Sequence, residues 1–284
     1  MRNLRALAHS GAELTADFPV MLSSYLYLAD WDLFRANGKM NDRSDYMKRI
    51  SGLTWSVAAA SLGLVGGYAA VAVWVPAGET RTAIIDIFLC VLPLFVNGAL
   101  LLNAITPDWR ENAFWMLLAL GCSLWLAGQS IWTYIEVYQH QPIPDPFIGD
   151  IVFFLHTVPM IAALTMQPHK HPDDRKMLYG YVDFALMFCW WVYLYVFVVI
   201  PWQYVVVDDG RYVQAYNVIS GLENLIFVGG AAMLAVKAMG RWRRIYAHLA
   251  GAGATCMFGV LLLELSTDRN TYSRGSLYNM PLVI

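Results

Sequence analysis

The feature that most constrains this chain is a series of apolar runs, each as long as a helix that crosses a membrane. An α-helix rises about 1.5 Å per residue, so about 20 apolar residues cross the hydrocarbon core of a bilayer. The sequence holds seven such runs, and an eighth begins near Gly275 and reaches Ile284. The seven runs cover residues 52–75, 83–105, 113–136, 147–167, 178–206, 215–237 and 243–265. We therefore predict an all-α fold, a polytopic transmembrane helix bundle with seven complete spans and the start of an eighth.

The positive charges are divided unequally between the two sides of these predicted spans. Of the 19 Lys and Arg residues, fifteen precede the first run or fall in alternate loops, and four fall in the opposite loops. Cytoplasmic segments of membrane proteins carry the excess of Lys and Arg, so we predict a cytoplasmic amino terminus. The hydrophobic content of 58% and the charged content of 14% agree with a membrane protein. We also expect Pro93, Pro159 and Pro201 to kink their spans or end them early.

Residues 1–50 form a separate region by their composition. They lack the apolar core and cleavage site of a signal peptide, and Asp30 and Asp32 interrupt the apolar run between residues 18 and 34. We predict a cytoplasmic segment that forms an interfacial amphipathic helix, with a poorly ordered extension as the alternative. Residues 51–284 form the membrane module. We expect it to be truncated in its last span, because a helix from Leu277 to Ile284 is too short to cross a bilayer.

Three stretches of sequence resemble a known kind of membrane module. The loop over residues 139–150 reads Gln-His-Gln-Pro-Ile-Pro-Asp-Pro-Phe-Ile-Gly-Asp, and a Phe-rich run containing Pro159 follows it directly. The sixth run contains Tyr216-Asn217 and Glu223-Asn224. The last run is entered over residues 272–281 by the sequence Tyr-Ser-Arg-Gly-Ser-Leu-Tyr-Asn-Met-Pro. In these features residues 52–284 resemble the amino-terminal module of seven or eight spans found in bacterial sensor histidine kinases and diguanylate cyclases.

That resemblance implies a location and a function. The module is expected in the bacterial inner membrane, where it senses a cue and moves its last helix to control a cytoplasmic histidine kinase or diguanylate cyclase. The expected partners are the lipid bilayer and an unknown small ligand or physical cue, and a homodimer is left open. The alternative is a small polytopic transporter or membrane enzyme. A transporter needs charged or broken helices at the middle of the bilayer, where this sequence has few polar groups.

Polar side chains in the outer half of the predicted bundle are the candidates for sensing or ligand binding. Ionisable groups inside a membrane are rare and are often functional. Those that we single out are Asp86, Gln129, Asp150, Glu223 and Glu264. Polar groups near helix ends are often only interfacial, and Asp150 could simply cap its helix.

The sixth run carries the strongest of these candidates. Ser220, Glu223 and Asn224 recur at a spacing of three to four residues with Tyr216 and Phe227, so they share one helix face. An ionised carboxylate at the depth of Glu223 is costly unless it is paired or hydrogen-bonded. We therefore expect Glu223 to be protonated or to contact water in an outward-opening pocket, with a structural hydrogen bond as the alternative.

His156 lies in the middle of the fourth run. It could be a haem or metal ligand or a pH sensor, and a core histidine bonded to a helix neighbour is the default expectation. His248 lies at another depth, so we expect no haem between the two histidines. We expect no cofactor and no metal, and the chain shows no Ser/His/Asp arrangement, HExxH motif or phosphate-binding loop that would make it an enzyme by itself. It has no concentrated basic patch of the kind that binds nucleic acid.

Overall fold

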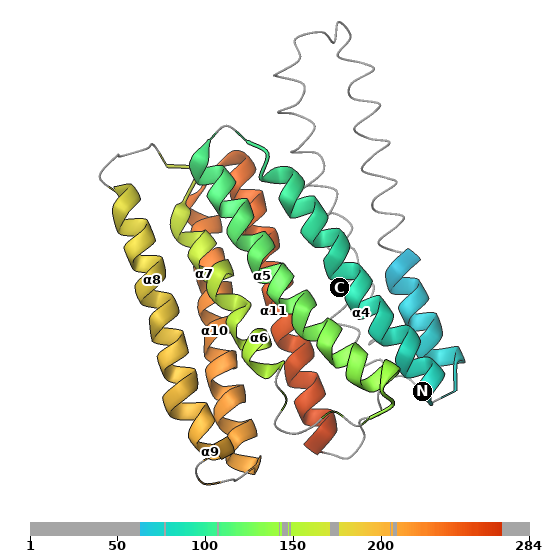
Figure 1. The fold of residues 1–284 in the computed structure, drawn as a ribbon. Coiled ribbons are helices and arrows are strands. Elements are labelled where there is room, and N and C mark those ends of the chain that lie inside the picture. Colours follow the sequence, from blue (N-terminus) through green and yellow to red (C-terminus); the bar gives the residue numbers. More distant parts are fainter. Residues whose placement is uncertain are drawn as a thin grey trace, which may run out of the picture.

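A computed structural model describes residues 63–268, apart from 77, 107, 142, 144–146, 148, 171–175, 205 and 207–208. Every regular element in these residues is a helix (Figure 1). The predicted cytoplasmic segment 1–50 and the start of the eighth span both lie outside the described residues.

The helices follow the predicted apolar runs. They are the helix Gly63–Trp74, α4 (Glu79–Asn103), α5 (Trp109–Thr133), η1 (Tyr134–Tyr138), α6 (Asp150–Leu155), α7 (Thr157–Met166), α8 (Lys176–Leu194), η2 (Tyr195–Val199), α9 (Ile200–Tyr204), α10 (Asp209–Lys237) and α11 (Gly240–Asp268).

Among the described residues, five helical segments are long and apolar enough to cross a membrane. They are Glu79–Asn103, Trp109–Tyr138, Ala185–Trp202, Arg211–Lys237 and Gly240–Leu262. The helices Gly63–Trp74 and Asp150–Met166 are apolar but shorter. Five segments therefore support a membrane fold. That the first, fourth and eighth predicted runs also cross the membrane completely remains a prediction.

Two interruptions in the helices coincide with prolines. Pro159 has no N–H to donate to the carbonyl of Leu155, and helix α6 ends at that residue before α7 begins at Thr157. Pro201 likewise cannot donate to Phe197, and the π-helical turn η2 precedes it, with the N–H of Ile200 bonded to the carbonyl of Tyr195. Pro93 lies inside α4, which continues past it. Two of the three prolines thus interrupt their helices as predicted.

The helices pack side by side, with α8 at one edge of the bundle and Gly63–Trp74 at the other (Figure 1). Polar side chains join α4 to α5: the Asn97 amide donates to the Ser123 hydroxyl at 2.8 Å, and the Cys122 thiol donates to the carbonyl of Pro93 at 3.3 Å. Helices α10 and α11 form an antiparallel hairpin joined at Ala238–Gly240, where Gly240 has a φ of 59° that favours glycine.

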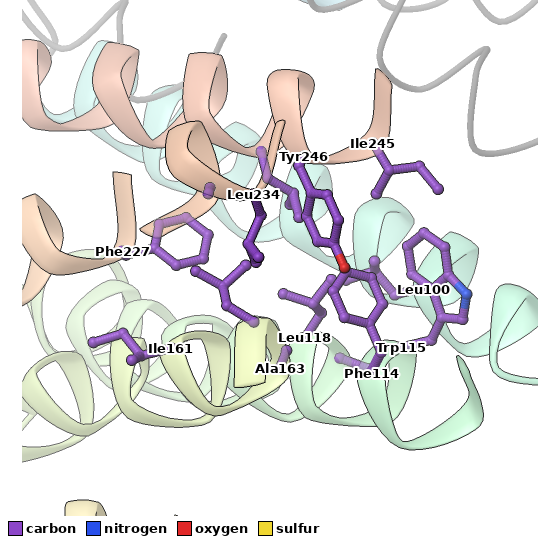
Figure 2. Close-up of a cluster of buried hydrophobic side chains, with 14 of the residues drawn as sticks. Leu100, Phe114, Trp115, Leu118, Ile161, Ala163, Phe227, Leu234, Ile245 and Tyr246 are labelled. Carbon is purple, nitrogen blue, oxygen red and sulfur yellow. The ribbon is translucent and has the colours of Figure 1, made fainter. Parts of the chain in front are cut away.

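A main core fills the space between this hairpin and helices α5 and α7. Figure 2 shows Phe227 and Leu234 of α10 and Tyr246 of α11 pointing toward Leu118 of α5 and Ile161 of α7. These five side chains are buried. The core therefore ties the hairpin to the centre of the bundle.

One end of the bundle gathers charged and aromatic side chains, and we call it the charged end. Arg241 at the start of α11 forms an ion pair of 2.7 Å with Glu111 at the start of α5. His169, just after α7, lies 3.1 Å from the Tyr246 hydroxyl. Three segments that the charge pattern assigns to the cytoplasmic side therefore share one end of the molecule, at the top of Figure 1.

Candidate functional site

Glu223 is the most unusual polar group in the described part of the chain. Its side chain has no exposed surface, and neither carboxyl oxygen has a hydrogen-bond partner among the described residues. Helix α10 turns this face inward, because Ile219 and Phe227, one turn to either side, are also buried. Phe227 belongs to the main core, and Ile219 belongs to a second cluster that α10 forms with α6, α7, α8 and η2. Glu223 thus lies between two apolar clusters.

The position of Glu223 along the bundle follows from the register of α10 against α6 and α7. The Tyr216 hydroxyl donates to the carbonyl of Asp150 at 3.4 Å, a separation of 66 residues. Four turns further along α10, a Cβ on Gly230 would lie 3.1 Å from the side chain of Leu164, which is again 66 residues away. The same offset places Glu223 level with Thr157, midway between the two contacts. Seven residues make about two helical turns, so all three pairs lie on the facing sides.

The level of Asp150 forms a hydrogen-bonded layer away from the charged end. Asp150 opens α6, and its Oδ2 accepts from the Tyr212 hydroxyl at 2.8 Å and from the N–H of Phe147 at 3.2 Å. The bond from Phe147 satisfies a backbone donor that precedes the helix, whereas Gly149 is the N-cap of α6 and no side chain caps it, so Asp150 contacts α10 rather than capping its own helix. Tyr212 is buried, and Tyr216 stacks beside it with ring centroids 6.3 Å apart.

The level of Thr157 contains the break between α6 and α7. Thr157 is buried with 2% of its surface exposed, and its hydroxyl lies 3.4 Å from Nε2 of His156. His156 also bonds through Nδ1 to the carbonyl of Phe153, in its own helix. The opposite side of the break packs against α5, where a Cβ on Gly121 would lie 2.6 Å from the carbonyl oxygen of His156. These contacts of His156 are with residues of its own segment, Phe153 and Thr157, and its predicted roles stay predictions.

The remaining predicted residues are placed apart or are engaged locally. The Asn224 amide donates to the carbonyl of Ser220 at 2.9 Å within α10, and both residues are half-buried. Gln129 on α5 and Asp86 on α4 are buried, with 7% and 6% of their surfaces exposed. Asp86 lies on the helix that packs against α5 rather than against α10. The structure therefore brings Asp150, His156 and Glu223 into one region and leaves Asp86 outside it.

Sequence analysis missed two members of this region, Tyr212 and Thr157. Tyr212 lies one turn before Tyr216 on the face that was already assigned to the bundle interior, so the helical period could have found it. Thr157 carried no such signal, because its importance depends on the register between α7 and α10. Only the structure supplies that register.

An open cleft of about 580 Å³ lies elsewhere, between the start of α4 and the end of α5 with η1. Its lining includes Glu79, Glu136, His140 and Gln141. Its described lining contains none of the predicted sensing residues. The expected outward-opening pocket around Glu223 is therefore not this cleft.

The chemistry available at Glu223 is that of a proton rather than a metal ion. A metal cation requires several oxygen or nitrogen ligands, and no group of three His, Cys, Asp or Glu side chains in the described residues could hold one. A carboxyl group with no donor around it is stable in an apolar interior only when it is uncharged. Protonation removes the charge and needs no further ligand.

No protein-family model matches the chain, and comparisons with curated proteins and with solved structures give no similar protein.

Proposed function

We propose that the chain is the membrane-embedded sensory input module of a bacterial signal-transduction protein. In this proposal the charged end faces the cytoplasm of a bacterial cell, and the layer of Asp150 and Tyr212 lies toward the outer side. The module relays its signal to a cytoplasmic output domain. The resemblance drawn from the sequence makes that domain a histidine kinase or a diguanylate cyclase.

The observation that carries the proposal is the buried, unpartnered carboxyl group of Glu223 on α10. Such a group weakens the packing around it, because its charged form cannot be satisfied in the arrangement present. A structural role alone would be served better by an apolar residue or a bonded polar one. A change in the charge of Glu223 would change the packing of α10, and this makes Glu223 suited to switch α10 between two arrangements.

The hairpin of α10 and α11 is the element that would transmit the change. Helix α11 packs closely on α10, since a Cβ on Gly253 would lie 2.9 Å from Val228 and 3.1 Å from Phe227. A shift of α10 at Glu223 would therefore move α11 with it. Helix α11 leads toward the carboxyl-terminal part of the chain, to which an output domain would be joined.

The test is a signalling reporter. The chain is extended after Ile284 by an apolar segment that completes the eighth span and is then joined to a diguanylate cyclase domain, and cyclic diguanylate is measured in cells that produce the parent fusion or its variants. We expect Glu223→Gln to change the cyclic diguanylate level several-fold. Glu136→Gln serves as the matched control, because Glu136 lies in η1 and bonds to Trp132 at 2.8 Å.

Equal cyclic diguanylate levels in the parent and the Glu223→Gln fusion, at equal membrane content, would contradict the sensory function. A solute flux through the unmodified chain in proteoliposomes would favour a transporter instead.

A further inference from the structure

The register between α10 and α7 places Glu223 and Thr157 at the same level, where the fourth apolar segment is broken. Two observed contacts on either side fix this register, Tyr216 with Asp150 and Gly230 with Leu164. Both side chains are buried, at 0% and 2% exposure. Polar groups that share a level between packed helices are placed to interact when one of them changes its charge or rotamer.

The break adds a backbone acceptor at this level. Helix α6 ends at Leu155, whose carbonyl lacks the donor that it would have in an unbroken helix, because Pro159 carries no N–H. A protonated carboxyl group can donate one hydrogen bond, whereas an ionised one can only accept. A backbone acceptor at the level of Glu223 therefore suits its protonated form better than its ionised form.

In the described residues, lysine and arginine on the elements packed against this part of α10 occur only near helix ends, and Lys176 is the first residue of α8. The segment 150–166, which forms α6 and α7, contributes His156 and Asp150, and η2 contributes Tyr195. Helix α11 contributes Cys256 near this level and His248 nearer the charged end, while its three arginines lie at residues 241, 243 and 244, near its start. The cations of α10 itself, Arg211 and Lys237, lie near its two ends.

We propose that Glu223 is an intramembrane proton-binding site, whose carboxyl group holds an exchangeable proton at neutral pH. The proton is the only ligand in this step: one O–H bond forms when the carboxylate is protonated and breaks when the proton leaves. Combined with the proposed function, the site makes proton activity the cue that the module reads. The proton site itself requires only the burial and register described above.

Infrared spectroscopy of the chain in lipid nanodiscs tests the proton site without any signalling readout. We expect a carboxylic acid C=O band at neutral pH that shifts when the glutamates are labelled with ¹³C and when the sample is moved into D₂O. Glu223→Gln should remove that band. Two controls should keep it: Glu136→Gln in η1, and Asp86→Asn, which replaces another buried carboxyl group.

A band that survives Glu223→Gln, or a parent spectrum without a ¹³C-sensitive carboxylic acid band, would overturn the proposal. If Glu223→Gln does not fold, Glu223→Asp should replace the ¹³C-glutamate band with an unlabelled band, and retention of the labelled band would overturn the proposal equally. The two proposals can also fail separately. If the band is assigned to Glu223 but the cyclic diguanylate level of the fusion changes neither with pH nor with Glu223→Gln, the proton site is supported and the sensory function is rejected.

Discussion

The hydroxyl of Tyr212 is the direct link between α10 and α6, because it donates to Asp150 at 2.8 Å. Tyr212→Phe keeps the ring and removes only this donor. Hydrogen bonds between membrane helices contribute about 1 kcal/mol, so we expect a loss of about that size in the free energy of unfolding. Thermal unfolding in detergent would measure it. Tyr134→Phe is the control, since Tyr134 is 51% exposed and stacks on Tyr138. Equal melting temperatures for Tyr212→Phe and the parent would contradict the role of this bond.

His169 at the charged end predicts how stability depends on pH. Partial burial lowers the pKa of His169 below its ordinary value, and the positive charge of Lys170 lowers it further. The unfolded chain then binds more protons than the folded one between the lowered pKa and the ordinary value of about 6.5. The neutral form of His169 therefore contributes its full stabilisation above the ordinary pKa. This stabilisation is lost as the pH falls from the ordinary pKa to the lowered pKa.

The measurement is the melting temperature across this pH range. We expect His169→Gln to show a smaller loss on acidification than the parent. Lys170→Gln should give an intermediate loss, because it removes only the second cause of the shift. A parent and a His169→Gln variant with the same pH profile would show that His169 does not carry the effect.

Among the elements, the contact of α5 with the break between α6 and α7 depends on a single glycine. A Cβ at Gly121 would lie 2.6 Å from the backbone carbonyl of His156 and 2.6 Å from the side chain of Met160. Backbone cannot move aside as a flexible side chain can, so Gly121→Ala should separate the two segments. We expect a loss of about 1–3 kcal/mol in the free energy of unfolding, as in other overpacked interiors. Gly98→Ala is the control, because its Cβ would meet nothing within 4 Å. A Gly121→Ala variant as stable as the control would contradict this packing.

The elements also show which parts of the fold could be read from the sequence. The apolar runs predict where the helices lie in the sequence, because the length needed to cross a membrane and the cost of burying charge are properties of each segment by itself. The breaks near Pro159 and Pro201 also follow from local chemistry, the missing N–H. The ion pair between Glu111 and Arg241 was not predicted, because the two residues come from different loops and meet only once α5 and α11 pack together. The inward direction of Glu223 was predicted from its helical face, whereas its neighbour Thr157 required the register between two helices.

For the molecule as a whole, the charge pattern predicts which end of the bundle faces the cytoplasm. The packing of the helices does not determine this orientation. Gln141 and Met239 are exposed at opposite ends of the described bundle. With the four native cysteines replaced, Gln141→Cys should react with a membrane-impermeant thiol reagent in intact cells. Met239→Cys should react only after the cells are opened. The reverse pattern would contradict the cytoplasmic assignment of the charged end.

We propose that the charge of Glu223 sets the position of the α10–α11 hairpin relative to the rest of the bundle. The most direct measurement is the distance between spin labels at Ile87 on α4 and Val218 on α10, both exposed, by pulsed electron resonance in nanodiscs. We predict that raising the pH from neutral shifts the distance distribution in the parent. The Glu223→Gln variant should keep the neutral-pH distribution of the parent at every pH. Identical distributions at all pH values in the parent, or the same pH-dependent shift in Glu223→Gln, would contradict the claim.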